Sequence, residues 1–257
     1  MKQILLLATF LCFIHASAQS VTGSCGGSAT YRYEAPTQTL YIDGSGNLYD
    51  YNDEPVNQPW SSFYQGVHHL VIGDGITSIG KECFTYLLAL ESVTIGSSVQ
   101  TIGEAAFMGL KLKEVIIPNS VTKIESHAFH TNLSLEKLTL GTGVVDIGAH
   151  AFEYCNITSL SIPSNVENIG LRCFCCNDNL SEIVIENRCN SLYIGSCAFT
   201  DTEIVYNKST SSYPKMKMEK ESLGCSYNLQ GNMVSKWNNG IIITRLSNGK
   251  VIKSLKQ

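Results

Sequence analysis

Three histidines and one arginine stand at matched places in this chain, and their side chains are the first candidates for chemistry. His127 and His150 each lie two residues before a phenylalanine, Arg172 takes the next equivalent position, and His130 lies one turn away. Converging imidazoles can hold a metal ion. No carboxylate occupies the neighbouring equivalent positions, however, and Arg172 would repel a cation. We therefore predict a surface row of side chains here, without a bound metal.

Other chemical signals in the chain are weak. Asp50, Asn52, Asp53 and Glu54 are acidic enough to suggest calcium, but their spacing lacks the central glycine and distal glutamate of an EF-hand loop. The motifs G-x-S-x-G, G-x-x-x-x-G-K-[ST] and H-E-x-x-H are all absent from the sequence. We therefore predict no catalytic residue, no cofactor and no enzymatic activity.

Nine of the 10 cysteines follow the first 18 residues, and an odd number defines no disulfide framework. Cys83 and Cys173 take the place that alanine has in the other copies of a repeat described below, which predicts buried thiols. Cys155, Cys175 and Cys176 are expected near one turn of adjacent copies, where a bridge is geometrically plausible but not assignable. The pair Cys175-Cys176 has no second pair at C-x-x-C spacing, so zinc is not predicted.

One motif, repeated six times, must position all of these side chains. It reads Val-x-x-Ile-Gly-x-x-Ala-Phe, followed by Leu-x-x-Val-x-Ile. Its phenylalanines, which are 22 to 25 residues apart, are Phe84, Phe107, Phe129, Phe152, Phe174 and Phe199. A unit this short cannot bury its own apolar face, so the copies must stack on one another as a solenoid.

Alternation within each copy predicts a short strand with one buried face. Val115 and Ile117 alternate with Glu114 and Ile116, which is the period of a β-strand. We predict a mostly β repeat solenoid of the α/β type, with about six coils of 22–23 residues and a parallel sheet. Equivalent strand residues should then form rows on the outer face of that sheet.

Two outward rows are predicted. The first holds the candidate partner-binding residues, which are Thr94, Ile116, Thr139, Ser161, Val184 and Tyr206. The second contains the succession His68, Glu91, Lys113 and Glu136, which places opposite charges side by side. The second row is expected to be a solvated ladder of ion pairs, each worth a few tenths of a kcal/mol, about what exposed pairs contribute.

The segments that flank the repeats do not follow the repeat pattern. Short strands around a turn at 43–46 predict an N-terminal β cap, with Trp60 packed on the first coil. Near the other end, Asn248-Gly249 between apolar runs predicts a β-hairpin. The predicted boundaries are a signal peptide at 1–18, the cap at 19–66, the repeats at 67–207, a linker at 208–224 and a C-terminal β segment at 225–257.

The first residues carry the pattern of an export signal. Lys2 precedes an apolar run at 4–14, and Ala16-Ser17-Ala18 fits a cleavage site, so the mature chain is expected to begin at Gln19. No later segment is long and apolar enough to cross a membrane. The 18 basic and 22 acidic residues leave no basic surface for nucleic acid. We expect a secreted or cell-surface protein.

The repeats resemble the BspA-like leucine-rich repeats of bacterial surface proteins. The resemblance covers residues 25–206 and is carried by Ile79-Gly80, Ala106-Phe107, Ile117-Pro118-Asn119-Ser120-Val121 and Ile162-Pro163, with a similar lead-in at Cys25-Gly26-Gly27 and Pro59-Trp60. The segment from Asn228 to Lys250 resembles short C-terminal sorting sequences of secreted Bacteroidetes proteins. The resemblance implies an exported protein, and some members of the family act as adhesins towards host matrix proteins or other bacteria.

We therefore predict a recognition module that binds a protein of the host matrix or of a bacterial surface through its sheet face. The alternative is a surface glycan-binding or nutrient-capture accessory protein without catalytic activity. That alternative would need an aromatic platform, for which Tyr206 is the strand-face candidate.

Overall fold

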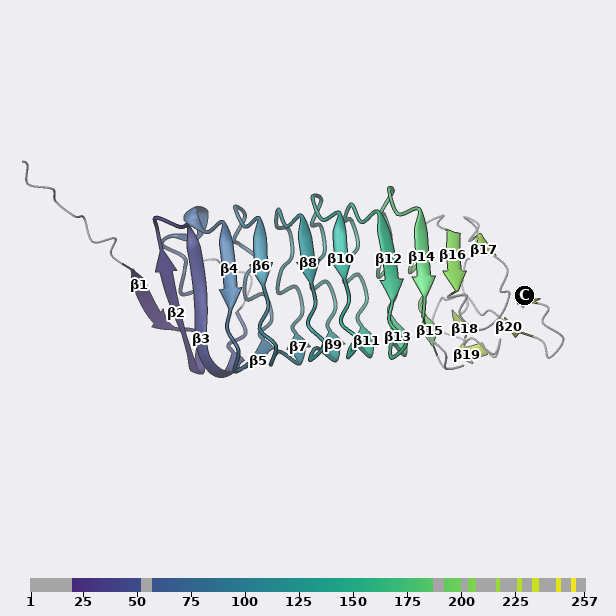
Figure 1. Cartoon of the computed structure of the whole chain (residues 1–257), viewed down its shortest axis with the longest axis horizontal. Helices are drawn as coiled ribbons and strands as arrows, with labels where there is room; N and C mark the ends of the chain where they lie inside the picture. Colours follow the sequence, from purple (N-terminus) through teal and green to yellow (C-terminus); the bar gives the residue numbers. More distant parts are fainter. Residues whose placement is uncertain are drawn as a thin grey trace, which may run out of the picture.

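The computed structural model describes residues 20–51, 57–186 and 192–199, together with the backbone of the strands that follow. The chain forms one elongated stack of coils with two rows of parallel strands (Figure 1). The front strands are β4 (His69–Ile72), β6 (Ser92–Thr94), β8 (Glu114–Ile116), β10 (Lys137–Thr139), β12 (Ser159–Ile162), β14 (Glu182–Ile185) and β16 (Glu203–Tyr206). The side strands are β5 (Ile76–Ile79), β7 (Thr101–Ile102), β9 (Lys123–Ile124), β11 (Asp146–Ile147), β13 (Asn168–Ile169) and β15 (Tyr193–Ile194).

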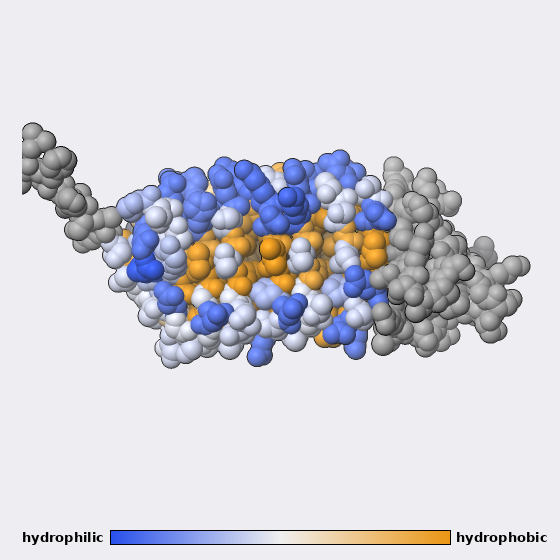
Figure 2. All heavy atoms as spheres, in the orientation of Figure 1, coloured by the Kyte–Doolittle hydropathy of each residue, from blue (hydrophilic) through white to orange (hydrophobic). Residues whose placement is uncertain are grey.

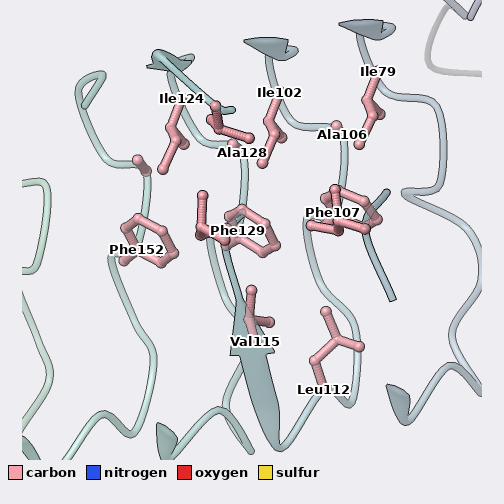
Figure 3. Close-up of a cluster of buried hydrophobic side chains, with 14 of the residues drawn as sticks. Ile79, Ile102, Ala106, Phe107, Leu112, Val115, Ile124, Ala128, Phe129 and Phe152 are labelled. Carbon is pink, nitrogen blue, oxygen red and sulfur yellow. The ribbon is translucent and has the colours of Figure 1, made fainter. Parts of the chain in front are cut away.

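The apolar residues of the repeat form the core, as the alternation of apolar and polar residues predicts. In front strand β8, Val115 is fully buried while its neighbour Ile116 is 59% exposed. The last isoleucines of β5, β7, β9, β11 and β13 are all buried completely. Figure 3 shows those of β5, β7 and β9 pointing into the stack beside the phenylalanines. The prediction of a mostly β parallel solenoid is confirmed, and the short 3-10 turn η2 (Tyr64–Gly66) lies before the first front strand.

A ladder of stacked aromatic rings runs along the centre of the solenoid. Trp60 begins it, with its ring centroid 5.2 Å from that of Phe84, which confirms the predicted packing of Trp60 on the first coil. The six repeat phenylalanines continue it at centroid separations of 5.0 to 5.4 Å. Stacked aromatic pairs contribute about 0.5–1.5 kcal/mol beyond the area they bury, so the ladder couples each coil to the next.

The five residues centred on each phenylalanine form what we call a Phe turn, and its backbone has an unusual shape. The first residue of every Phe turn has a positive φ of 51–60°, although none is glycine; these residues are Glu82, Ala105, His127, His150, Arg172 and Cys197. Left-handed backbone costs roughly 1–2 kcal/mol per non-glycine residue. A hydrogen bond offsets this cost, because the N–H of His127 donates to the Ala149 carbonyl of the next coil, 3.0 Å away, and the earlier and later turns do likewise.

The fifth residue of four successive Phe turns is also left-handed, with φ between 54° and 75°; these are Gly109, Thr131, Tyr154 and Cys176. The N–H of Thr131 donates to the Glu153 carbonyl at 2.8 Å, again along the stack. In the three turns centred on Phe107, Phe129 and Phe152, the first, third and fifth residues thus donate to the next coil. This third hydrogen-bonded ladder fixes the direction of every side chain on the turns.

Two buried asparagines cross-link the turns from inside. The amide of Asn132 is completely buried and donates to the Phe107 and Phe129 carbonyls, each at 2.8 Å. Asn177 makes the equivalent bonds to Phe152 and Phe174 two coils later. These side chains donate to main-chain carbonyl groups inside the stack and so help to satisfy its buried polar groups.

The N-terminal end is closed by three antiparallel strands, β1 (Val21–Ser24), β2 (Gly26–Glu34) and β3 (Thr39–Leu48). The turn predicted at 43–46 is wrong, because β3 continues through it and only bends at its glycines, while the chain reverses at 35–38 instead. Glycine is needed at 44 for another reason: its φ is 99°, and a Cβ there would lie 2.2 Å from the Ser28 carbonyl oxygen. The bend lets β3 pair with both β4 and β5.

At the other end, antiparallel strands continue both strand rows. β17 (Met216–Lys217) pairs with β16, and β18 (Ser226–Tyr227) joins β15 to β19 (Met233–Ser235). The range 208–224, predicted as a linker, therefore contains a strand. β20 (Thr244–Arg245) and β21 (Val251–Ile252) pair antiparallel on either side of Asn248-Gly249. The predicted signal peptide lies outside the described residues.

Candidate functional site

The outer face of the front strands carries most of the predicted binding row. The register places Val71 beside Thr94, Ile116 beside Thr139 and Ser161 beside Val184. Thr94, Ile116, Thr139 and Ser161 are exposed, whereas Val184 is half-buried. Figure 2 shows apolar surface along the middle of this face, with hydrophilic side chains on both borders.

Tyr206 does not continue this row. The register of β14 and β16 pairs Val184 with Val205, and it pairs Tyr206 with Ile185, which is a buried core position. The interval between equivalent residues shortens by one at the last coil, and a shift of one residue exchanges the two faces of a strand. Val205 therefore takes the register position that the repeat spacing assigns to Tyr206.

The charged border of this face is only partly paired. His68 Nδ1 lies 3.6 Å from Glu91 Oε1, and Lys113 Nζ lies 3.9 Å from Glu91 Oε2. Within the described structure, no ion pair joins Lys113 to Glu136. Because these side chains are exposed, each pair contributes about 0–1 kcal/mol. The border therefore contributes little to stability.

A second polar group lies on the Phe turns, where the histidines were predicted to stack. The rings of His127 and His150 do stack, with centroids 4.7 Å apart and planes 8° apart. The ring of His130 faces that of His127 edge-on, with the two ring centroids 5.3 Å apart. Arg172 occupies the next turn, as predicted from the spacing. The row is therefore a real feature of the surface, created by the left-handed first residue of each turn.

Sequence reasoning missed the carboxylate at the centre of this group. Glu153 is only 3% exposed, and it receives hydrogen bonds from Arg172 Nε at 2.7 Å and from His150 Nδ1 at 2.5 Å. The His130 Nε2 atom lies 3.6 Å from Glu153 Oε2. No carboxylate occupies an equivalent position beside the histidines, as the sequence indicates, but Glu153 reaches them from the fourth position of its turn. Its spacing of three residues from His150 was the available signal.

The electrostatics of the group follow from burial and pairing. Burial acts to raise the pKa of Glu153, but the hydrogen bonds from His150 and Arg172 outweigh it and leave that pKa lower than usual. Burial lowers the pKa of His127 and of His130, and the neighbouring imidazoles lower both further. At neutral pH, Glu153 is therefore charged, Arg172 neutralises it, and His127 and His130 are neutral.

Glu153 and two thiols are close enough to consider as metal ligands. Ligand atoms of Glu153, Cys175 and Cys176 lie within 4.8 Å of one another. Both oxygens of Glu153 already accept hydrogen bonds, however, one from Arg172 and the other from His150. A cation would have to displace these partners and sit beside the guanidinium. The donor set therefore does not fit a metal ion well.

The cysteines of the described residues are all free thiols. Cys83 and Cys173 are completely buried, which confirms their prediction as substitutes for alanine. Cys155 does not approach the other two candidates for a bridge, and its thiol lies 3.3 Å from the Phe129 carbonyl. Of the acidic loop considered for calcium, Asp50 accepts the backbone N–H of Lys81 at 2.7 Å, and residues 52–54 lie outside the described residues.

The repeat, the strand register and the Phe ladder together agree with a single family. The profile of the BspA type leucine-rich repeat region matches six copies, over residues 61–133 and 100–219, which is more than half of the chain. The chain belongs to this family. Leucine-rich repeat proteins of this kind are protein-binding modules, and the resemblance of the repeats to this family is thereby confirmed.

Solved structures of bacterial leucine-rich repeat proteins are similar to this one. A leucine-rich repeat protein of Treponema pallidum is 18% identical, with a TM-score of 0.47, over 62% of this chain and 80% of that one. A leucine-rich cell surface protein of Faecalibacterium prausnitzii is 22% identical, with a TM-score of 0.43, over 71% of this chain and 60% of that one. A leucine-rich repeat protein of Eubacterium ventriosum is 16% identical, with a TM-score of 0.37, over 72% of this chain and 78% of that one.

No match was found among curated protein sequences. Across the described part of the chain, no helix has the length and apolar character needed to span a membrane. The family and its fold are therefore the findings from which a function has to be argued.

Proposed function

We propose that the protein is a non-catalytic recognition module, exported to the cell surface or secreted, that binds a protein partner through the outer face of the front strands. The partner class is a host extracellular-matrix protein or a surface protein of another bacterium. Thr94, Ile116, Thr139, Ser161 and Val184 are the proposed contact residues. The membership of the leucine-rich repeat family supports protein binding in general, and the exposed row supports this choice of face.

The observation that carries the proposal is the exposure of Ile116. Its side chain is 59% exposed at the middle of the row, where it is flanked on β10 by the small polar side chain of Thr139. The fold does not need an isoleucine there, because the core contacts are made by its buried neighbours on either side, Val115 and Ile117. Contact residues of interfaces are apolar at the centre and polar at the rim, which is the arrangement of this face.

An extended segment of a partner suits the geometry better than a deep ligand site. The row crosses successive parallel strands about 4.8 Å apart, so equivalent side chains form a regular strip. Charged side chains such as Glu91 and Lys113 border the strip and would orient an approaching partner. The rigid stack holds the strip in one shape, which lowers the entropy cost of binding.

The test is a pull-down from host-matrix and bacterial-surface extracts with the full chain as bait. Ile116→Asp should abolish capture while leaving the circular dichroism unchanged, because a charge at the centre of an apolar contact must be desolvated. Leu133→Asp is the matched control, since Leu133 is 66% exposed but lies in the turn between Phe129 and β10. Unchanged capture by Ile116→Asp would contradict the proposed face.

Glycan binding is an outcome of the same test rather than a second proposal. It would need an aromatic platform on the strands, and the register moves Tyr206 out of the outward row. If a glycan array gave hits that Ile116→Asp removed, the partner class would be carbohydrate instead.

A C-terminal sorting role is tested separately: deleting residues 225–257 should leave the protein in the periplasm.

A further inference from the structure

Two adjacent thiols touch on the fifth Phe turn. The Sγ atoms of Cys175 and Cys176 are 3.4 Å apart, and one thiol donates to the other. Cys175 is buried, at 6% exposure, whereas Cys176 is half-buried and reaches the surface. Adjacent side chains in a strand point to opposite faces, so this contact requires a special backbone.

The Phe turn supplies that backbone. Cys176 is the left-handed fifth residue of its turn, with φ of 59°, and Cys175 is the fourth. The same two positions two coils earlier are His130 and Thr131, where φ of Thr131 is also 59° and the His130 Nδ1 atom lies 2.6 Å from Thr131 Oγ1. The repeat therefore brings the fourth and fifth side chains together, and the thiols meet because of their place in the coil.

We propose that Cys175 and Cys176 are a reversible modification site, which closes to a disulfide between neighbouring residues by exchange with a low-molecular-weight disulfide such as oxidised glutathione. This chemistry uses the two thiols alone. It needs no third ligand, unlike a metal site, so the occupied oxygens of Glu153 do not oppose it.

The two thiols have different parts in the exchange. The thiolate of Cys176, the more accessible sulfur, attacks the external disulfide, forms a mixed disulfide and releases one thiolate. Cys175 then loses its proton to solvent, and its sulfur attacks the Cys176 sulfur and expels the second thiolate. Two electrons pass from the cysteine pair to the external disulfide, which leaves as two thiols once protonated.

The second step has the higher barrier. Burial and the hydrogen bond with Cys176 together raise the pKa of the Cys175 thiol to about 12, so its thiolate is scarce at neutral pH. Contact at 3.4 Å makes the attack intramolecular, which offsets this scarcity. A bridge between neighbours is also easily reduced, because consecutive Cα atoms are only about 3.8 Å apart and ordinary bridges prefer longer separations.

Closure would change the surface beside it. The thiol of Cys176 interacts with the side chain of Tyr154, whose pKa it raises, and Tyr154 is 44% exposed on the preceding turn. A bridge removes the S–H and draws the sulfur towards Cys175. The site thus couples the redox state of the surroundings to one exposed aromatic ring.

The experiment uses the reduced full chain, oxidised glutathione, and denaturing alkylation with N-ethylmaleimide before peptide mass spectrometry. The peptide that follows Arg172 contains Cys173, Cys175 and Cys176, and it should take up one maleimide instead of three after oxidation. Dithiothreitol should restore all three. A wild-type peptide that still takes up three, or a bridge from Cys175 to Cys155, would overturn the proposal.

Variants separate this pair from its neighbours. Cys175→Ser should stop at the mixed disulfide, so glutathione stays on Cys176, whereas the same peptide of Cys176→Ser should take up no glutathione. Cys173→Ala is the matched control, because alanine fills its slot in other coils, and it should still close the bridge. Loss of closure in Cys173→Ala would overturn the assignment of the pair.

Discussion

The inner and outer sides of the Phe turns share one backbone but differ in sequence. Inside, six phenylalanines stack at nearly equal separations of 5.0 to 5.4 Å. Outside, the fourth position of successive turns changes in every coil and is occupied by Thr85, Met108, His130, Glu153 and Cys175. Stacking therefore constrains only the side chains that meet the next coil inside the core, and the outer positions are open to new chemistry.

The largest expected effect comes from breaking the inner side. Phe129→Ala removes a fully buried ring from the middle of the ladder, and it should lower the free energy of unfolding by roughly 3–5 kcal/mol. The remaining coils on either side can then unfold as two separate blocks. Urea denaturation followed by circular dichroism measures both the loss and the number of transitions.

The control for this variant is Leu133→Ala. Leu133 lies four residues further along the same coil but is 66% exposed, so its loss should change stability by less than about 0.5 kcal/mol. Equal losses for Phe129→Ala and Leu133→Ala would refute the distinction between the two sides.

A smaller effect is expected on the outer side, at Glu153. Glu153→Gln removes the charge that Arg172 and His150 contact, and it should cost about 1–3 kcal/mol, less than a fully buried pair because the Arg172 side chain is 38% exposed. Thermal unfolding gives the measurement. Glu91→Gln is the control: its side chain is 46% exposed, and the change should cost less than about 0.5 kcal/mol. If both cost the same, Glu153 is not the centre of the cluster.

The smallest expected effect is a pH dependence of the outer cluster. The folded pKa values of His127 and His130 lie below their usual value of 6.5, so the unfolded chain binds more protons just below pH 6.5 and stability falls as the pH drops from 7 to 5.5. The pKa of Glu153 is lowered from 4.5, so its contribution is present above that value and is lost only at more acidic pH. His127→Asn, which tolerates a positive φ, should flatten the fall near pH 6.

This dependence is measured as the urea midpoint at each pH. A wild-type midpoint that stays constant between pH 7 and 5.5 would contradict the neutral, packed state of the histidines. A fall that is unchanged in His127→Asn would assign it to other groups.

Much of the fold was predictable from the sequence, because a repeat this short can bury its apolar residues only by stacking on the next copy. Units that repeat every 22 to 25 residues with alternating apolar residues must stack on one another. The burial of Val115 in β8 and of Ile117 directly after it follows from that alternation. The stacking of His127 on His150 also follows, since equivalent positions in neighbouring coils must lie side by side.

The sequence by itself thus determined the family, the core and the succession of rows. Tertiary structure alone decided three matters. It decided that Tyr206 leaves the outward row, because register depends on hydrogen bonding between coils and not on residue count. It decided that β3 continues through its glycines, and that Glu153 and the two thiols of 175–176 turn towards their neighbours. These last contacts depend on left-handed residues that are not glycine, and the hydrogen bonds that residues such as His150 and Arg172 donate to the next coil offset their cost.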